Sequence, residues 1–145
     1  MKTKMRGFSL LELMVVVGIM VLLASIAIPG YQRYVQRANR SDATNALLRI
    51  ASSEEKFFLQ NNTYTTNFAQ LGLNNVSENG HYNIALAANA AGLVVGFTAT
   101  AAPAATSGQL NDATCQSFTL DQAQTRTALD GGAVDQTARC WGGKN

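Results

Sequence analysis

One acidic residue stands inside the most apolar stretch of the chain. Residues 8–28 read FSLLELMVVVGIMVLLASIAI and carry a single charge, on Glu12. A carboxylate inside a membrane helix is energetically costly, and such residues usually have a role and a partner. Glu12 is therefore the first candidate for a functional residue, and the chemistry that it offers is pairing with a positive charge.

The apolar stretch is long enough to cross a bilayer. As a helix its 21 residues would reach about 31 Å, close to the roughly 30 Å hydrocarbon core. A cleavable secretory signal has a shorter apolar region of about 7 to 15 residues. The sequence therefore predicts a membrane span over residues 8–30, with Lys2, Lys4 and Arg6 on the cytoplasmic side.

Two cysteines, Cys115 and Cys140, lie near the C-terminus. Their spacing is neither a CxxC redox motif nor half of a zinc site. Because a membrane span makes export of the following residues expected, the pair indicates a disulfide. Such a bond would close a loop of about 26 residues and stabilise the fold by roughly 3 to 4 kcal/mol, through the restriction of the unfolded chain.

The sequence contains no motif for catalysis, metal binding or cofactor binding. The single histidine, His81, has no accompanying nucleophile motif. The acidic residues of the C-terminal part do not follow the calcium-loop spacing; they are Asp112, Asp121, Asp130 and Asp135. We therefore expect no catalytic residues, no metal and no cofactor, and a protein that is not an enzyme.

The string GFSLLE at residues 7–12 follows a short basic leader and precedes about twenty apolar residues. This arrangement resembles the class III signal of type IV prepilins. The resemblance implies that a prepilin peptidase removes residues 1–7 by cutting between Gly7 and Phe8, and that it methylates the new amine of Phe8. It also implies that Glu12 becomes the fifth residue of the mature chain, where this family has its glutamate.

The chemistry of these positions suits an assembly role for Glu12. The new amine of Phe8 is positive near neutral pH, and both charges are costly in an apolar filament core unless they pair. We therefore expect the Phe8 amine of one subunit to pair with Glu12 of a neighbour. The expected partners are other pilin subunits, the prepilin peptidase/N-methyltransferase, the inner membrane and its assembly platform.

One long helix is predicted from about residue 8 to residue 59. Pro29 and Gly30 weaken it locally, but in a membrane helix such a pair more often makes a kink than an end. After the span, apolar residues recur at helical intervals; examples are Tyr34, Val35, Ala38, Leu47, Ile50 and Ala51. Residues 31–60 are therefore expected to form an amphipathic helix that packs on the rest of the head.

The remaining head, residues 61–145, shows strand patterns. Strands are expected at 81–87, 93–101, 115–121 and 124–129, with a hairpin turn at 89–92 and a surface loop over 101–111. No helical period separates them, so an antiparallel sheet of three or four strands should cover the amphipathic helix. The fold class is α+β, and it is similar to the type IV pilin fold, with a soluble head over residues 31–145.

Three arginines follow the span on one face of the predicted helix: Arg33, Arg37 and Arg40. Three interpretations stay open for this stripe. It could be solvated or contact lipid headgroups, it could form ion pairs with Asp42 or with residues 54–55 of a neighbouring subunit, or it could contact DNA.

The overall charge does not favour strong DNA binding. The whole chain carries +2, but without residues 1–7 it has 8 basic and 9 acidic residues, or −1. A nucleic-acid-binding protein usually has a clear basic excess. Arg126, Arg139 and Lys144 could still form a local basic patch, so DNA binding remains a less favoured alternative.

The resemblance implies a structural subunit of a type IV pilus, a family whose functions include adhesion and twitching motility. It places the loop between Cys115 and Cys140 at the variable surface region of such subunits. The expected localisation is the inner membrane and then the extracellular pilus of a Gram-negative bacterium. Chain length and the Cys140–Trp141 ending are most similar to PilE-type minor pilins. A DNA-uptake (competence) pilin and a type II secretion pseudopilin are the alternatives, and the cysteine pair weighs against the pseudopilin.

Overall fold

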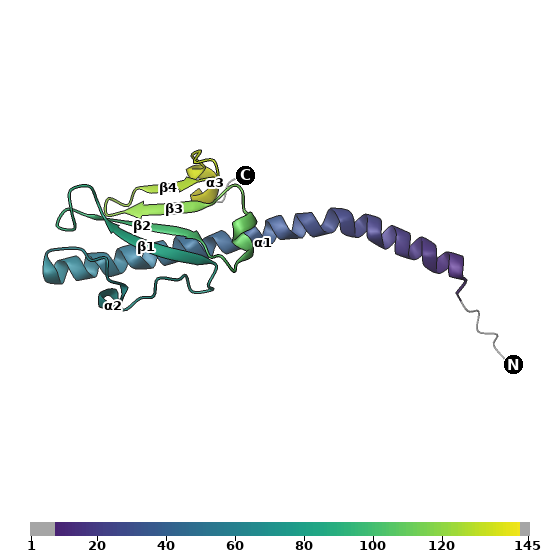
Figure 1. Cartoon of the computed structure of the whole chain (residues 1–145), viewed down its shortest axis with the longest axis horizontal. Helices are drawn as coiled ribbons and strands as arrows, with labels where there is room; N and C mark the ends of the chain where they lie inside the picture. The colour runs from purple at the N-terminus through teal and green to yellow at the C-terminus, as the bar shows by residue number, and fades with distance from the viewer. Residues whose placement is uncertain (1–7, 143–145) are drawn as a thin grey trace. The chain divides into compact units, whose positions relative to one another are not determined.

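The structure is a computed structural model that describes residues 8–142, so Gly7, the leader and Lys144 lie outside the described residues. The chain divides into two units, Met1–Val35 and Gln36–Asn145. The elements in chain order are α1 (Leu10–Asn61), α2 (Phe68–Leu71), β1 (Tyr82–Ala88), β2 (Phe97–Pro103), the 3-10 helix η1 (Gly108–Asn111), β3 (Ser117–Asp121), β4 (Arg126–Leu129) and α3 (Thr137–Gly142) (Figure 1).

Helix α1 confirms the expected long helix. Pro29 lies inside it and does not end it. The helix stops where Asn62 takes a φ of 53°, while the Asn62 N–H still donates to the carbonyl of Phe58 at 2.8 Å. Asparagine tolerates this left-handed conformation better than most residues, which explains the stop.

In the first unit, α1 is exposed from Leu10 to Tyr34. By length and composition this helix contains a segment able to cross a membrane, and none of that segment is buried within the chain. Large apolar side chains such as Leu22 and Ile26 are therefore left without cover by the described residues. An apolar surface of this kind needs cover from a bilayer or from other chains.

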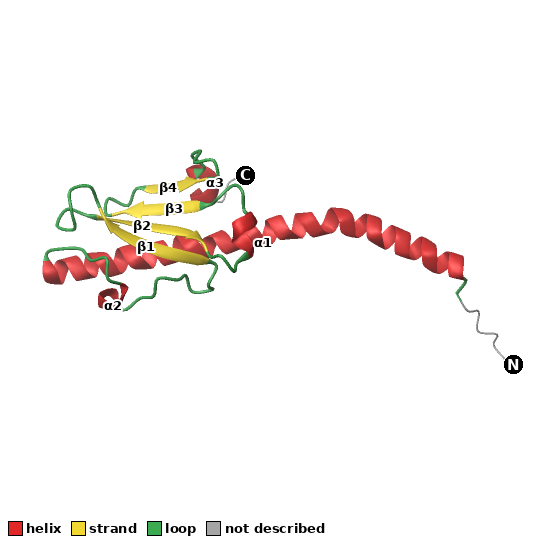
Figure 2. Ribbon diagram, in the orientation of Figure 1, coloured by secondary structure: helices red, strands yellow, loops and turns green. Residues whose placement is uncertain are grey.

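In the second unit, the four strands form an antiparallel meander in the order β1-β2-β3-β4, which confirms the expected sheet (Figure 2). Alternate residues of each strand point into the core, as the two-residue period of a strand requires. They include Tyr82, Ile84, Phe97, Ala99, Ala101, Phe118, Leu120 and Ala128. The core side of α1 supplies Leu47 and Ile50, and burial of each such side chain stabilises the fold by about 1.5 to 3 kcal/mol.

Strand β2 begins at Phe97, later than expected. The predicted start of this strand at residue 93 is therefore wrong, and so is the predicted end of the turn at residue 92. The connection continues to Gly96, because the N–H groups of Val95 and Gly96 both donate to the carbonyl of Gly92 at 3.1 Å. The carbonyl of Leu93 accepts from the N–H of Tyr64 at 3.0 Å. Leu93, which the apolar pattern places in the strand, therefore forms a long-range backbone hydrogen bond with Tyr64.

The loop expected over 101–111 is also wrong in part. Strand β2 continues to Pro103, and the 3-10 helix η1 follows after a short connection. Gln109 of η1 is buried, although glutamine at this position predicts exposure. Its burial is explained by the polar contacts described below.

A polar clamp fastens η1 and the following residue to α1. Gln109 Nε2 donates to the hydroxyl of Tyr82 at 2.7 Å and to the carbonyl of Gln36 at 3.1 Å. Burial raises the pKa of Tyr82 to about 12, so this hydroxyl stays neutral at physiological pH. Arg40 completes the clamp with two hydrogen bonds to Asp112, Nε to Oδ2 at 2.7 Å and Nη2 to Oδ1 at 2.8 Å.

Two expectations about charged residues near α1 are therefore corrected. Arg40 pairs inside its own chain and is not a free member of the arginine stripe, whereas Arg33 is exposed. Asp42 is buried and accepts four hydrogen bonds from Ser77, Asn79 and His81, so it is not available to a neighbouring subunit.

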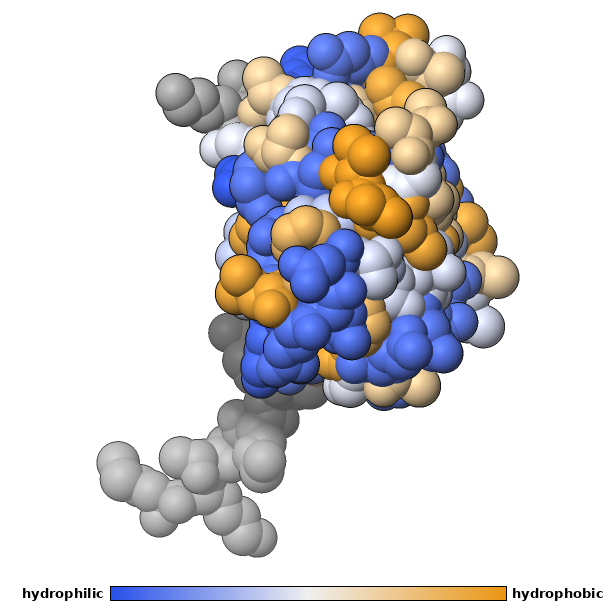
Figure 3. All heavy atoms as spheres, turned by 90° about the vertical axis from the view of Figure 1, so that its left-hand side faces the viewer, coloured by the Kyte–Doolittle hydropathy of each residue, from blue (hydrophilic) through white to orange (hydrophobic). Residues whose placement is uncertain are grey.

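Apolar side chains also reach the surface where α1 ends and where β1 connects to β2. Leu59, Val94 and Val95 are exposed there. Figure 3 shows this face of the molecule, on which orange hydrophobic groups stand among blue hydrophilic ones. Single exposed apolar residues are common on protein surfaces.

The ion pair of Arg40 should contribute much more to stability than the exposed pair of Arg49 with Glu78. The Arg40 and Asp112 side chains are 14% and 3% exposed, against 59% and 76% for Arg49 and Glu78. Arg40→Ala would leave a buried carboxylate unpaired and should lower the free energy of unfolding by about 3 kcal/mol. Arg49→Ala, the matched control, should lower it by about 1 kcal/mol or less. Thermal unfolding of the full-length protein in detergent, followed by Trp141 fluorescence, measures both; equal losses would contradict the prediction.

Glu54 should make the stability of the head depend on pH. Its side chain is fully buried, and one carboxylate oxygen accepts from the Thr65 N–H at 3.0 Å, while the other has no hydrogen-bond partner among residues 8–142. Burial raises the pKa of Glu54 above its ordinary value of 4.5; the Thr65 hydrogen bond opposes this rise and the Glu55 carboxylate adds to it. The folded protein therefore holds this proton more tightly than the unfolded chain, and stability should fall as pH rises from about 4.5 through the raised pKa.

The variant Glu54→Gln tests this, because glutamine does not titrate. We expect the melting temperature of the wild type to decrease between about pH 4.5 and pH 7.5, and this decrease to be smaller in Glu54→Gln. Glu78→Gln removes an exposed carboxylate from the same unit and should keep the wild-type slope. A slope that is unchanged by Glu54→Gln would refute the assignment.

Candidate functional site

The first turn of α1 contains the expected assembly residue. Glu12 is the third residue of the helix, and its N–H donates to Oγ of Ser9 at 3.2 Å. Ser9 thus acts as the N-terminal cap, and a carboxylate in the first turn is favoured by the helix dipole. A capping role for Ser9 was not among the sequence-based predictions, although the spacing Ser-x-x-Glu is a known capping signature.

The described residues show the surroundings of Phe8, Pro29 and Gly30 but do not test their roles. Phe8 is exposed directly before the helix. Pro29 and Gly30 are exposed within it, and a side chain at Gly30 would meet nothing within 4 Å. Close packing inside the described chain therefore does not require this glycine, and the kink remains a prediction.

The second candidate region is the C-terminal loop. Cys115 and Cys140 form the expected disulfide, with their Cα atoms 5.9 Å apart and both residues buried. The bond links Cys115, which lies just before β3, to Cys140 in α3. Helix α3 was not predicted from the sequence. The disulfide thereby holds a segment that has few apolar residues of its own.

This segment covers the outer edge of β4. The Gln136 N–H donates to the carbonyl of Ala128 at 2.8 Å, and the Ala128 N–H donates to Oγ1 of Thr137 at 2.9 Å. Exposed strand edges invite pairing with other chains, and a covering segment prevents this. The C-terminal loop is therefore a structural part of the sheet as well as a surface feature.

Trp141 packs at the base of this loop. Its Nε1 donates to the carbonyl of Thr127 at 2.8 Å, and its ring meets Phe118 edge-on at 6.1 Å between centroids. The guanidinium carbon of Arg126 lies 5.3 Å from the centroid of the same ring, a cation–π arrangement. Arg126 on β4 and Arg139 on α3 are both exposed on elements that contact each other.

The acidic residues near the C-terminus form turns. Asp130 Oδ1 accepts from the N–H groups of Val134 and Gly132, both at 2.9 Å, and these hydrogen bonds keep the pKa of Asp130 below its ordinary value. His81 has a main-chain role, because its N–H donates to Asp42. Within residues 8–142 no group of three or more His, Cys, Asp or Glu side chains is placed to hold a metal ion.

Two family models match adjacent parts of the chain. The family model described as "Prokaryotic N-terminal methylation motif" matches residues 2–28. The family model described as "Type IV minor pilin ComP, DNA uptake sequence receptor" matches residues 29–119, which is more than half of the chain.

Individual relatives are pilins. The chain is 33% identical over 100 residues to the fimbrial protein EcpC of Eikenella corrodens, a match that covers 69% of this chain and 65% of EcpC. It is 34% identical over 97 residues to the type IV wide pilus major component PilA4 of Thermus thermophilus, covering 64% of this chain and 74% of PilA4. The chain thus spans slightly less than two thirds of EcpC, and less than half of several other curated pilins.

The fold is shared with a solved pilin. The structure of the non-core minor pilin PilV of Neisseria meningitidis matches with a TM-score of 0.54 at 24% identity, over 70% of this chain and 93% of PilV. With the methylation motif, the match to the minor-pilin family model and the identity to PilA4, this shared fold gives one conclusion: the chain is a type IV pilin of the family of the minor pilin ComP.

Proposed function

We propose that this pilin is a minor structural subunit of a type IV pilus and takes part in pilus assembly. The observation that carries the proposal is that two family models follow one another along the chain, the methylation motif over residues 2–28 and a minor-pilin model over residues 29–119. The fully exposed apolar part of α1 supports it, because packing among neighbouring subunits would cover that surface.

The proposed route begins in the inner membrane of a Gram-negative bacterium. Prepilin peptidase cuts after Gly7 and methylates Phe8, the assembly platform extracts the chain, and the Phe8 amine pairs with Glu12 of a neighbour. The position of Glu12 in a capped first turn supports this pairing, since the cap orders the backbone that carries the carboxylate. Adhesion and twitching motility are the processes that such a filament would serve.

A pseudopilin of type II secretion shares the same N-terminal signal and is the weaker alternative. The relatives reported above are fimbrial and pilus proteins, and the disulfide Cys115–Cys140 also favours a pilus subunit. In the proposed function the protein has no catalytic role. It acts through charge pairing between subunits, through packing of the apolar helix and through display of the head on the filament surface.

Glu12→Leu should block incorporation into filaments without blocking processing. The variant leaves the Phe8 amine of the incoming subunit unpaired in an apolar core, so incorporation should fall by about tenfold or more, the factor that corresponds to 1.4 kcal/mol. Quantitative mass spectrometry of sheared surface filaments measures incorporation, and the mass of the membrane-bound pool reports cleavage after Gly7.

Met14→Leu is the matched control, because it exchanges one apolar residue for another in the same segment.

The wild-type chain should be present in sheared filaments in trace amounts relative to a major subunit, which is the signature of a minor pilin. A dominant signal would identify a major pilin instead. Normal cleavage together with normal incorporation of Glu12→Leu would rule out the pairing role.

The family model also favours a second function, recognition of DNA. Its description names a DNA uptake sequence receptor, which the net charge of the mature chain does not suggest. The local distribution of charge is more favourable for DNA binding than the net charge is, because Arg126 and Arg139 are exposed on adjoining elements beside Trp141. We propose this C-terminal surface as the place where duplex DNA would bind.

Arg126→Ala and Arg139→Ala should each weaken binding and reduce the dependence on salt. Each lost phosphate contact lowers the slope of log K against log salt by about 0.9. Fluorescence anisotropy of a labelled 20-base-pair duplex (about two helical turns), titrated with full-length protein in a non-ionic detergent at several salt concentrations, measures both effects. Lys56→Ala, an exposed lysine on α1, is the control. Absence of binding at low salt, or equal slopes for all variants, would exclude this surface.

A further inference from the structure

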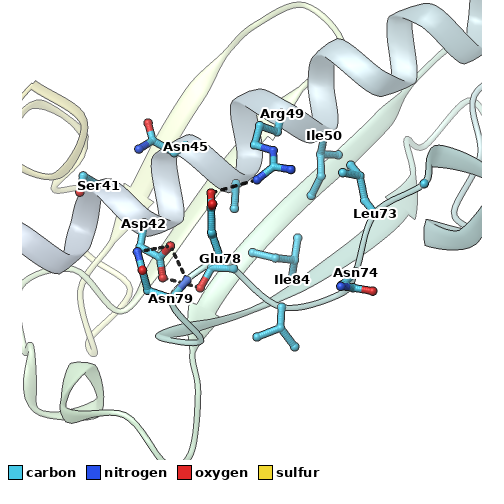
Figure 4. A pocket seen from close by; sticks show the side chains of 14 residues that line it. Ser41, Asp42, Asn45, Arg49, Ile50, Leu73, Asn74, Glu78, Asn79 and Ile84 are labelled. Atoms are coloured by element: carbon cyan, nitrogen blue, oxygen red, sulfur yellow. Dashed lines mark hydrogen bonds and ion pairs between the residues drawn. The ribbon is translucent and has the colours of Figure 1, made fainter.

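One charged side chain of the first unit has no role in the functions proposed above. Arg33 is exposed and makes no hydrogen bond or ion pair with any other described residue. Two arginines of the head, in contrast, are paired within the chain: Arg40 with Asp112, and Arg49 with Glu78 (Figure 4). Arg33 is therefore available to bind an anion from outside the chain.

Arg33 lies just beyond the segment of α1 that is able to cross a membrane. It follows Ile28, the last residue of the apolar stretch, by five residues, which is about 8 Å of helix. The headgroup layer outside the hydrocarbon core is about 5 to 8 Å thick on each side of a bilayer. Because side chains in a helix lean toward its N-terminus, the guanidinium of Arg33 reaches back into this layer when the apolar stretch fills the core.

Two exposed tyrosines lie at the same level of the helix. Tyr31 is 69% exposed and Tyr34 is 70% exposed. Since a helix turns by about 100° per residue, Arg33 lies about 160° from Tyr31 and about 100° from Tyr34 around the axis. The three side chains thus surround the helix, whereas a protein or DNA partner would contact one face. Lipid meets a helix from every side, and tyrosine is enriched at the boundary between hydrocarbon and water.

The spacing between Arg33 and Glu12 matches the thickness of a bilayer. The two residues are 21 positions apart in α1, which is about 32 Å along the helix. The hydrocarbon core is about 30 Å thick, so one depth of insertion brings the two charged groups to opposite interfaces. Contact of Arg33 with headgroups therefore keeps the Glu12 carboxylate out of the hydrocarbon before assembly, where it would be energetically costly.

We propose that Arg33 binds the phosphate of an anionic phospholipid in the leaflet on the exported side of the membrane. A guanidinium can donate two parallel hydrogen bonds to a phosphate, and its positive charge favours an anionic lipid over a zwitterionic one. The inference rests on the membrane stage of the proposed function. It holds whether the chain is a minor or a major subunit of the filament.

Native mass spectrometry of the full-length protein tests the proposal. The delipidated protein in a non-ionic detergent is mixed with equal amounts of phosphatidylglycerol and phosphatidylcholine that have the same acyl chains. We expect Arg33→Gln to lower the ratio of phosphatidylglycerol adducts to phosphatidylcholine adducts by about twofold to fivefold. The lower value applies if the basic leader also binds anionic lipid. Circular dichroism should show an intact fold, because Arg33 has no partner among the described residues.

Two further variants and one competitor make the result specific. Lys56→Gln removes an exposed cation of the second unit and should keep the wild-type ratio. The exchange Gln32→Arg/Arg33→Gln turns the guanidinium by about 100° around the helix but keeps its depth within about 1.5 Å. Because lipid surrounds the helix, this exchange should also keep the ratio. Inorganic phosphate should not displace the bound phosphatidylglycerol.

An unchanged ratio in Arg33→Gln would overturn the proposal. So would a loss in the exchange variant as large as that in Arg33→Gln, because it would indicate a partner that contacts one face, such as a carboxylate of another subunit or DNA. Displacement by inorganic phosphate would also overturn it, since it would indicate a site for free anions. Incorporation into filaments is measured separately on sheared filaments, so failure of this proposal and failure of the proposed function are distinguishable.

Discussion

A single helix that must satisfy two different environments is the constraint on which the rest of the structure depends. Over residues 10–28, α1 is apolar around its whole circumference apart from Glu12, and it is exposed, so only a bilayer or other subunits can cover it. Over residues 36–61 the same helix buries one side against the sheet and presents polar residues on the other. The change comes where Gln36 and Arg40 begin to contact η1 and Asp112, so the polar clamp marks the start of the folded head.

Carboxylates on or beside α1 organise the loops that have too few apolar residues to hold themselves. Asp42 accepts the hydrogen bonds that fold the segment before β1, Glu54 accepts from Thr65 after the helix, and Asp112 pairs with Arg40. A buried carboxylate is unfavourable unless it is hydrogen-bonded, so each of these contacts defines one geometry of its loop. Glu54 satisfies this only in part, which links the stability of this end of the head to pH.

The features proposed for function occupy separate parts of the chain. The proposed assembly contact involves the first turn of α1, and the proposed DNA-binding surface lies near Trp141. These two regions share no side chain. A variant in one of them should therefore leave the other unchanged, since sites without shared partners usually act independently.

The sequence alone determined the features that depend on local composition and period: the apolar helix with Glu12, the GFSLLE signal, the strand alternation around Phe118 and Leu120, and the cysteine pair. Tertiary structure decided which partner each polar residue takes. Arg40 bonds to Asp112 across 72 residues, Gln109 is buried because Tyr82 and Gln36 meet it, and β2 starts late because Leu93 bonds to Tyr64. The hydrophobic period can be recognised from residues that are close together in the sequence. The choice of a hydrogen-bond partner depends instead on which distant segments the sheet register brings together. No single segment determines that register.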